Sequence, residues 1–239
     1  IAPHPPLASD FLALLEPPGP AHPFGTDQLG RDVLSRVLHG GRSVLAVAPA
    51  ATALGLALGT AIGLVAAYLG GWADEVAMRL LDAVMALPIV IVAMLALTFL
   101  GASTLNVILV IGVVFAPLVA RTIRAAALVE VRKDYVRAAE LRGEGVLYIL
   151  FGEVLPNVAG PLAVEGTLRL GYAVFTAATL GFLGLGAQPP APDWGLMVAE
   201  NQALMTTAPW TVLFPALAIA WVVVGIALVS DGLRIGHGP

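Results

Sequence analysis

Residues Ser43–Ala73 read SVLAVAPAATALGLALGTAIGLVAAYLGGWA, and none of these 31 side chains carries a charge. Crossing the ~30 Å hydrocarbon layer of a bilayer takes about 20 apolar residues in a helix. The part from Val44 to Leu69 is long enough for one such crossing. We therefore predict that the chain spans a membrane, and we use this helix as the reference for the rest of the sequence.

The composition of the whole chain supports a membrane protein. Of its 239 residues, 59% are hydrophobic and 12% are charged, whereas soluble domains have about 45–50% and about 25%. So few charged side chains cannot cover the surface of a soluble core. The composition excludes an ordinary globular enzyme, a disordered chain and a nucleic-acid-binding protein, and it makes the lipid bilayer the expected surroundings. There is no cysteine, so disulfides and thiolate metal sites are excluded.

Further apolar runs predict the remaining spans of an all-α membrane bundle. The uncharged run Ala83–Ala120 is too long for one crossing, and Gly101–Asn106 offers a turn that would divide it into a hairpin. Its second member is expected to continue past Pro117 into Arg121 and Arg124. The five predicted spans are Val44–Leu69, the two halves of Ala83–Ala120, Pro161–Leu185 and Trp210–Ser230.

The basic residues predict how the chain is oriented, because loops rich in Lys and Arg stay in the cytoplasm. Half of the twelve lie in one connection between the third and fourth spans: Arg121, Arg124, Arg132, Lys133, Arg137 and Arg142. We expect this connection and Gly70–Glu75 to be cytoplasmic, and residues 1–43 to face outward. Arg31, Arg36 and Arg42 run against this orientation.

Motifs for catalysis or metal binding are missing. A P-loop needs G-x-x-x-x-G-K-[ST], but the only lysine is Lys133, between Arg132 and Asp134. The histidines lack the spacing of metal ligands, so no metal site is expected at His4, His22, His39 or His237. We predict no catalytic residue and no cofactor bound by this chain.

The charged residues near the predicted span ends, and the small residues within the first span, have structural interpretations. Arg79–Asp82 and Glu165–Arg169 have the spacing at which opposite charges neutralise one another on one helix face. A lining of the translocation path is the alternative interpretation of these pairs. Gly55, Gly59 and Gly63 recur every fourth residue, which predicts the close approach of another helix.

The basic connection, about residues 125–157, is the most informative cytoplasmic segment. Tyr135–Gly143 predicts a short surface helix that ends at Gly143, where glycine can adopt the left-handed conformation of a helix cap. One interpretation is a helix whose arginines face anionic headgroups. The other is a docking helix that transmits force from a cytoplasmic motor, and the pattern favours neither.

The segment YVRAAELRGEGVLYILFGEVLPN, Tyr135–Asn157, resembles the conserved cytoplasmic loop of ABC-importer permeases. Arg137 stands where that family usually has Glu, and Glu144-Gly145 replaces the usual small residues after the glycine. The resemblance assigns an ATPase-coupling role to Tyr135, Arg137, Ala138, Ala139, Gly143, Leu155, Pro156 and Asn157.

Two further stretches narrow the resemblance to the dipeptide, oligopeptide and nickel importer permeases, as the C-type subunit. HPFGTDQLGRDVLSRVLHGGRSVL, His22–Leu45, is similar to their signature before the second span. FLGLGAQPPAPDWGLMVAEN, Phe182–Asn201, is similar to their outward loop before the last span. The signature positions are His22, Gly25, Thr26, Asp27, Gly30, Arg31 and Asp32.

The resemblance implies a type I importer permease fold with six spans, of which the five predicted here would lack the first. Residues 44–235 would form the permease domain. It also implies a second homologous permease, two cytoplasmic ATPases that bind ATP and Mg, and an extracellular solute-binding protein. The implied substrate is a small solute, most simply a di- or oligopeptide, handled in the cell membrane of a bacterium or archaeon.

Other readings stay open. An ATP-independent secondary carrier or channel is the first alternative, although no unpaired acidic residue lies in a predicted span. A membrane scaffold whose basic loop binds lipid is the second. Trp194, in the outward loop, is a candidate contact for the binding protein.

Overall fold

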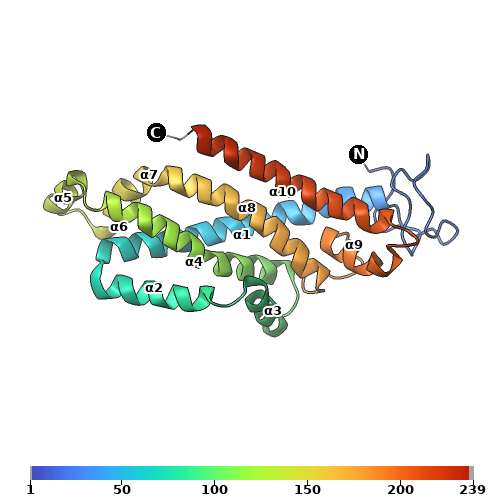
Figure 1. Ribbon diagram of the computed structural model, residues 1–239, viewed down its shortest axis with the longest axis horizontal. Coiled ribbons are helices and arrows are strands. Elements are labelled where there is room, and N and C mark those ends of the chain that lie inside the picture. Colours follow the sequence, from blue (N-terminus) through green and yellow to red (C-terminus); the bar gives the residue numbers. More distant parts are fainter. Residues whose placement is uncertain (1, 237–239) are drawn as a thin grey trace.

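The computed structural model describes the backbone of residues 2–236 and the side chains of residues 2–232. Four long helices run along the long axis of the molecule: α1 (Val33–Leu69), α4 (Thr104–Glu130), α8 (Ala159–Phe182) and α10 (Trp210–Gly236) (Figure 1). Within the described residues the extended structure amounts to one isolated bridge between Thr26 and Asp32. The predicted all-α class is confirmed.

The spans agree in number with the prediction, but two of them are broken. Helices α1, α4 and α10 are each long and apolar enough to cross a membrane. Helices α2 (Gly71–Met85) and α3 (Ile89–Leu100) form a pair bent by 86°, and Val146–Asn157 forms another with α8, bent by 75°. Counting each bent pair as one span gives five.

The first bent pair corrects the predicted boundaries. The second span does not begin near Ala83, and Gly70–Glu75 is not a loop, because α2 begins at Gly71 directly after α1 ends. The charged residues of α2 interrupted the apolar run in the sequence but not the helix. The break comes at Pro88, which caps α3, because proline cannot continue a helix from inside it.

Other boundaries follow the predictions more closely. Helix α3 ends at Leu100, and Ser103 caps α4 by accepting a hydrogen bond from the Asn106 backbone N–H at 3.1 Å. The predicted turn at Gly101–Asn106 is therefore confirmed. Helix α1 begins at Val33, so its first turns lie within the segment 1–43.

Helix α1 is the centre of the bundle and packs against α4 and α8. Helices α2 and α3 lie beside α4, and the remaining short helical segments lie toward the two ends of the long axis (Figure 1). One end, which we call the α5 end, carries α5 (Asp134–Leu141), α6 (Val146–Tyr148), a π-helical turn η1 (Ile149–Val154) and α7 (Leu155–Asn157). The other, the α9 end, carries the N-terminal segment, α9 (Trp194–Asn201) and η2 (Gln202–Leu204).

Candidate functional site

The signature before α1 folds into a compact loop at the α9 end, with Asp27 at its centre. The Asp27 carboxylate accepts hydrogen bonds from the backbone N–H groups of Leu29 at 2.9 Å and Arg31 at 3.0 Å, and from Nε of Arg31 at 2.7 Å. The buried Thr26 hydroxyl donates to the carbonyl oxygen of Ala13 at 2.6 Å. These hydrogen bonds give the polar residues of the signature a structural role, because they hold the loop in one conformation.

The glycines of the signature are required by the path of the backbone. Gly25 and Gly30 have φ angles of +71° and +68°, a region that favours glycine. A Cβ on Gly30 would lie 1.8 Å from the carbonyl oxygen of Asp10, and one on Gly25 would lie 2.5 Å from that of Glu16. No other residue fits either position without moving the N-terminal segment.

Two arginines connect this loop to α9. Arg31 Nη2 and Arg36 Nη2 lie 3.3 Å and 3.2 Å from the same Glu200 oxygen, and Arg36 Nη1 lies 3.6 Å from Asp27. Arg36 is 1% exposed, so its charge depends on these carboxylates. The sequence offered no reason to join Arg36 to Glu200, since 164 positions separate them.

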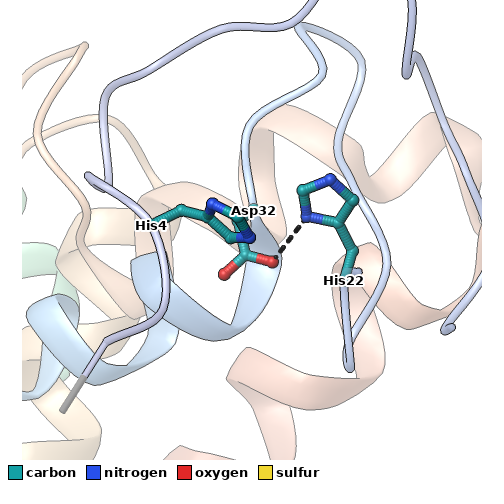
Figure 2. A group of neighbouring side chains, drawn as sticks. All are labelled: His4, His22 and Asp32. Atoms are coloured by element: carbon teal, nitrogen blue, oxygen red, sulfur yellow. Dashed lines mark hydrogen bonds and ion pairs between the residues drawn. The ribbon is translucent and has the colours of Figure 1, made fainter. Parts of the chain in front are cut away.

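Asp32 caps α1 and is braced by a histidine (Figure 2). One carboxylate oxygen accepts from the Ser35 backbone N–H at 2.7 Å, and the other lies 2.9 Å from His22 Nδ1. Burial alone would raise the pKa of Asp32, but the hydrogen bonds from Ser35 and His22 outweigh it and lower the pKa. The His22 and Asp32 positions of the signature therefore fix the start of the first long helix.

His4 lies beside this cap, so that His4, His22 and Asp32 place three possible metal ligands within 4.8 Å of one another (Figure 2). Sequence spacing gave no sign of this cluster, because the fold alone brings His4 to the cap. Both Asp32 oxygens already take part in hydrogen bonds, and the positive end of a helix disfavours a cation. The chemistry of the cluster is that of a braced helix cap.

The predicted coupling segment contains a short amphipathic helix at the α5 end. In α5, Val136 and Ala139 are buried, whereas Arg137 and Ala138 are exposed. Gly143 has a φ of +77°, and the Glu144 N–H donates to the Ala139 carbonyl at 3.2 Å. The sequence prediction of a left-handed cap at Gly143 is confirmed.

Hydrogen bonds join this segment to the long helices. The Tyr135 hydroxyl donates to Glu130 of α4 at 3.0 Å, and the Tyr68 hydroxyl of α1 donates to Glu140 of α5 at 3.0 Å. Burial, followed by the Glu130 carboxylate, raises the pKa of Tyr135 to about 12. A displacement of α5 therefore acts on both α1 and α4.

The rest of the predicted coupling residues lie where this segment enters α8. Leu155, Pro156 and Asn157 form α7, directly after the π-helical turn, a form common at functional sites. Leu155 is half-buried, and Pro156 and Asn157 are exposed. The structure thus places all eight predicted coupling residues at one end of the molecule, with α5 and α7 on either side of the π-helical turn.

The glycines of α1 meet α4 at close range. A Cβ on Gly59 would lie 2.5 Å from Val119 Cβ, and one on Gly63 would lie 2.6 Å from the Ala120 carbonyl oxygen. At Gly55 the nearest atom is the Gly112 carbonyl oxygen at 3.0 Å. Small residues at these positions let the two backbones approach.

The sequence predicts two charge pairs near the ends of the spans. One pairing is confirmed and one is wrong, and Arg169 of the confirmed pair lies in the middle part of α8 rather than near its end. Arg169 Nε donates to Glu165 Oε1 at 2.6 Å. Arg79 instead pairs with Glu75 at 2.6 Å, and Asp82 lies 3.3 Å from Arg121 of α4. Asp82 therefore joins two helices.

Trp194 does not offer a contact to a binding protein. It is 6% exposed, and its indole N–H donates to the Val37 carbonyl oxygen at 2.7 Å. At the N-terminus of α9, burial raises the pKa of its neighbour Asp193, which accepts from the Ser43 hydroxyl at 3.2 Å. Both residues attach α9 to α1.

The sequence is similar to permeases of known transport systems. It is 39% identical over 225 residues to the dipeptide transport system permease protein DppC of Alkalihalophilus pseudofirmus, covering 94% of this chain and 74% of that one. It is 39% identical to the protein of the same name from Haemophilus influenzae, covering 100% and 83%. The glutathione transport system permease protein GsiD of Pectobacterium atrosepticum is 39% identical, with coverages of 96% and 76%.

The fold is similar to that of a chain of the MetNI methionine ABC transporter, solved in inward-facing conformations. The TM-score is 0.67 at 17% identity, over 85% of this chain and 97% of that one. The predicted importer permease fold is therefore confirmed. Residues 59–234 match the family described as the binding-protein-dependent transport system inner membrane component. The chain is a multi-pass membrane protein and belongs to this family of transport permeases.

Proposed function

We propose that this chain is the membrane-spanning subunit of an ATP-binding-cassette importer that carries di- or oligopeptides into a bacterial or archaeal cell. The observation that carries the proposal is the 39% identity, over 94% and 100% of the chain, to two permeases named for dipeptide transport. Those names also make an ATP-independent carrier or channel the less favoured alternative.

The α5 end is the proposed cytoplasmic docking site for an ATPase. Its exposed surface combines the cation of Arg137 with three large apolar side chains. These are Leu141, which is 89% exposed, Leu147, which is 72% exposed, and Tyr148, which is 52% exposed. An exposed apolar surface of this kind suits a partner protein rather than water. We infer that two ATPases bind the complex, one at this surface and one on a second, homologous permease.

The division of labour follows from what the chain carries. ATP and Mg would bind only to the partner ATPases, and this chain would supply no catalytic residue, cofactor site or metal site. Residues 1–43 would face outward to meet the solute-binding protein, and 44–235 would form the permease domain with its coupling segment at about 125–157. The mechanism is differential contact in two states, since ATP binding favours one arrangement of the spans and hydrolysis restores the other.

A pull-down from native membranes, combined with uptake, tests this function. Tagged full-length chain should co-purify with a second permease and P-loop ATPases, and the reconstituted complex with its binding protein should take up a labelled dipeptide only with ATP. Recovery of the chain alone, with uptake driven by an ion gradient, would instead establish the carrier alternative.

A further inference from the structure

Helix α8 carries a charged pair at the middle of its length. Arg169 is ten residues from the first residue of α8, Ala159, and thirteen from the last, Phe182, or about 15 Å and about 20 Å at 1.5 Å per residue. Phe115, which faces it from α4, is also in the middle part of its helix. A charge in the middle of a membrane-spanning helix is costly unless it is paired or meets a polar pathway, and residues of this kind mark substrate routes.

Glu165 neutralises Arg169 but engages only one of its nitrogens. Arg169 Nε donates to Glu165 Oε1 at 2.6 Å, while the other Glu165 oxygen lies 3.4 Å from the Thr122 hydroxyl. Within the described part of the chain, no hydrogen bond involves Arg169 Nη1 or Nη2. The Arg169 side chain is 15% exposed, so it is not fully enclosed by the subunit.

Two aromatic rings hold the guanidinium in place. Its Cζ atom lies 5.9 Å from the centroid of the Phe115 ring and 5.3 Å from that of Tyr172. Phe115 is buried at 1% exposure, whereas Tyr172 is 56% exposed. The contacts with the two rings and the bond to Glu165 restrict the planar group, which lies near both the buried Phe115 ring and the exposed Tyr172 ring.

A free guanidinium edge has a specific chemical complement. Its two terminal nitrogens match the two oxygens of a carboxylate in parallel hydrogen bonds. Lipid tails cannot supply such a group, so the free edge suits a translocation path or another protein subunit better than the hydrocarbon of the bilayer. In an importer of peptides, the path carries a free carboxylate at the end of each substrate.

We propose that Arg169, oriented by Glu165, Phe115 and Tyr172, binds the carboxylate of the substrate as it passes the middle of the membrane. The ligand class is a small solute with a free carboxylate, and for a peptide it is the C-terminal one. This inference rests on the proposed function, because it needs a path enclosed with a second permease. It assigns to the permease a recognition step separate from that of the binding protein.

The test compares two substrates in the reconstituted complex of permeases, ATPases and binding protein. One is a labelled dipeptide with a free C-terminus and the other is its C-terminal amide, each supplied with the binding protein saturated, as checked by its own fluorescence. The test variant is Glu165→Gln/Arg169→Gln, which removes both charges and leaves no buried carboxylate unpaired. Glu75→Gln/Arg79→Gln removes the matched, exposed pair of α2 and is the control.

We expect the wild type and the control to take up the free acid at least tenfold faster than the amide. In the test variant that ratio should fall to about one, while the two permeases and the ATPases still co-purify. Arg169→Lys, which keeps the charge but loses the fork, should give an intermediate ratio. An unchanged ratio in the test variant, whether or not the uptake of both substrates falls, would overturn the proposal. Loss of the second permease on purification would also overturn it. A wild-type complex that transports neither dipeptide would overturn the proposed function itself.

Discussion

Trp194 and Val37 join α9 to α1 through one hydrogen bond, in which the indole N–H donates to the backbone carbonyl at 2.7 Å across 157 positions of sequence. The ring also lies against the backbone of α1, since a Cβ on Gly40 would be 2.7 Å from Trp194 Cδ1. Trp194, the first residue of α9, is thus a buried anchor that holds the α9 end together.

Replacing Trp194 should lower the free energy of unfolding, and the loss should be larger when both the packing of the ring and its hydrogen bond are removed. Trp194→Ala removes a buried ring and should cost about 3–5 kcal/mol. Trp194→Phe keeps most of the packing but loses the hydrogen bond, and should cost less. The measurement is denaturant unfolding in detergent, with Trp221→Ala as the control, because Trp221 is 78% exposed on α10. Equal losses in Trp194→Ala and Trp221→Ala would show that the anchor is not needed.

The contact between α1 and α4 predicts opposite outcomes at two glycines. A methyl group on Gly59 would lie 2.5 Å from Val119 Cβ and 2.6 Å from the Ala116 carbonyl oxygen, whereas one on Gly225 of α10 would meet nothing within 4 Å. Gly59→Ala should therefore force the helices apart and cost about 1–3 kcal/mol. Gly225→Ala should be neutral or slightly stabilising, because glycine is a poor helix former.

Thermal unfolding of both glycine variants in the same detergent checks this contrast. If Gly59→Ala unfolds at the same temperature as the wild type, α1 and α4 do not pack at the distance described here.

Hydrophobic runs predicted most of the fold, because crossing a bilayer imposes a length and an apolar composition on each span. The turn at Gly101–Asn106 and the cap at Gly143 could be predicted because they depend on the residues of the turn itself and not on packing against other helices. The broken second span was missed, because Asp74, Glu75 and Arg79 look like a loop in the sequence. In the structure they lie on a helix and pair with Arg124 of α4 or with each other.

The contacts that assemble the candidate site join residues distant in sequence, and periodicity carries no information about them. Glu200 contacts Arg31 and Arg36 because the fold places the last turn of α9 beside the start of α1. His4 reaches Asp32 only through the path of the N-terminal segment. The Glu165–Arg169 pair could be predicted from its spacing, but its aromatic neighbours could not, since Phe115 comes from another helix.

The pKa of Tyr135 predicts a loss of stability at high pH. It is raised from 10.0 to about 12, first by burial and then by the hydrogen bond to Glu130. The folded state therefore favours the neutral phenol, and this stabilisation is complete below pH 10 and lost as the pH rises through about 12. We expect the link between α5 and α4 to weaken in that interval.

A difference-absorbance titration of phenolate formation measures this shift. Subtracting the Tyr135→Phe curve from the wild-type curve should leave one ionisation near pH 12. In Glu130→Gln, which lacks the carboxylate that accepts the bond, the same ionisation should move to lower pH. A Tyr135 ionisation at pH 10 in the wild type would contradict both the burial of this side chain and its hydrogen bond to Glu130.

A side chain at Gly143 should abolish transport while leaving insertion into the membrane intact. Its φ of +77° is strained for other residues, although a Cβ there would meet nothing within 4 Å. Gly145 is equally open but has an ordinary φ of −72°. Gly143→Val should therefore unwind the end of α5 and abolish at least nine-tenths of the uptake, while membrane levels stay normal. Gly145→Val, with the same added volume two residues away, should keep most of the uptake. Both variants are measured by labelled dipeptide uptake alongside immunoblots of the membrane fraction.

Full uptake by Gly143→Val would show that α5 has no coupling role. An equal loss of uptake in both variants would show that the added side-chain volume, and not the helix cap, causes the loss.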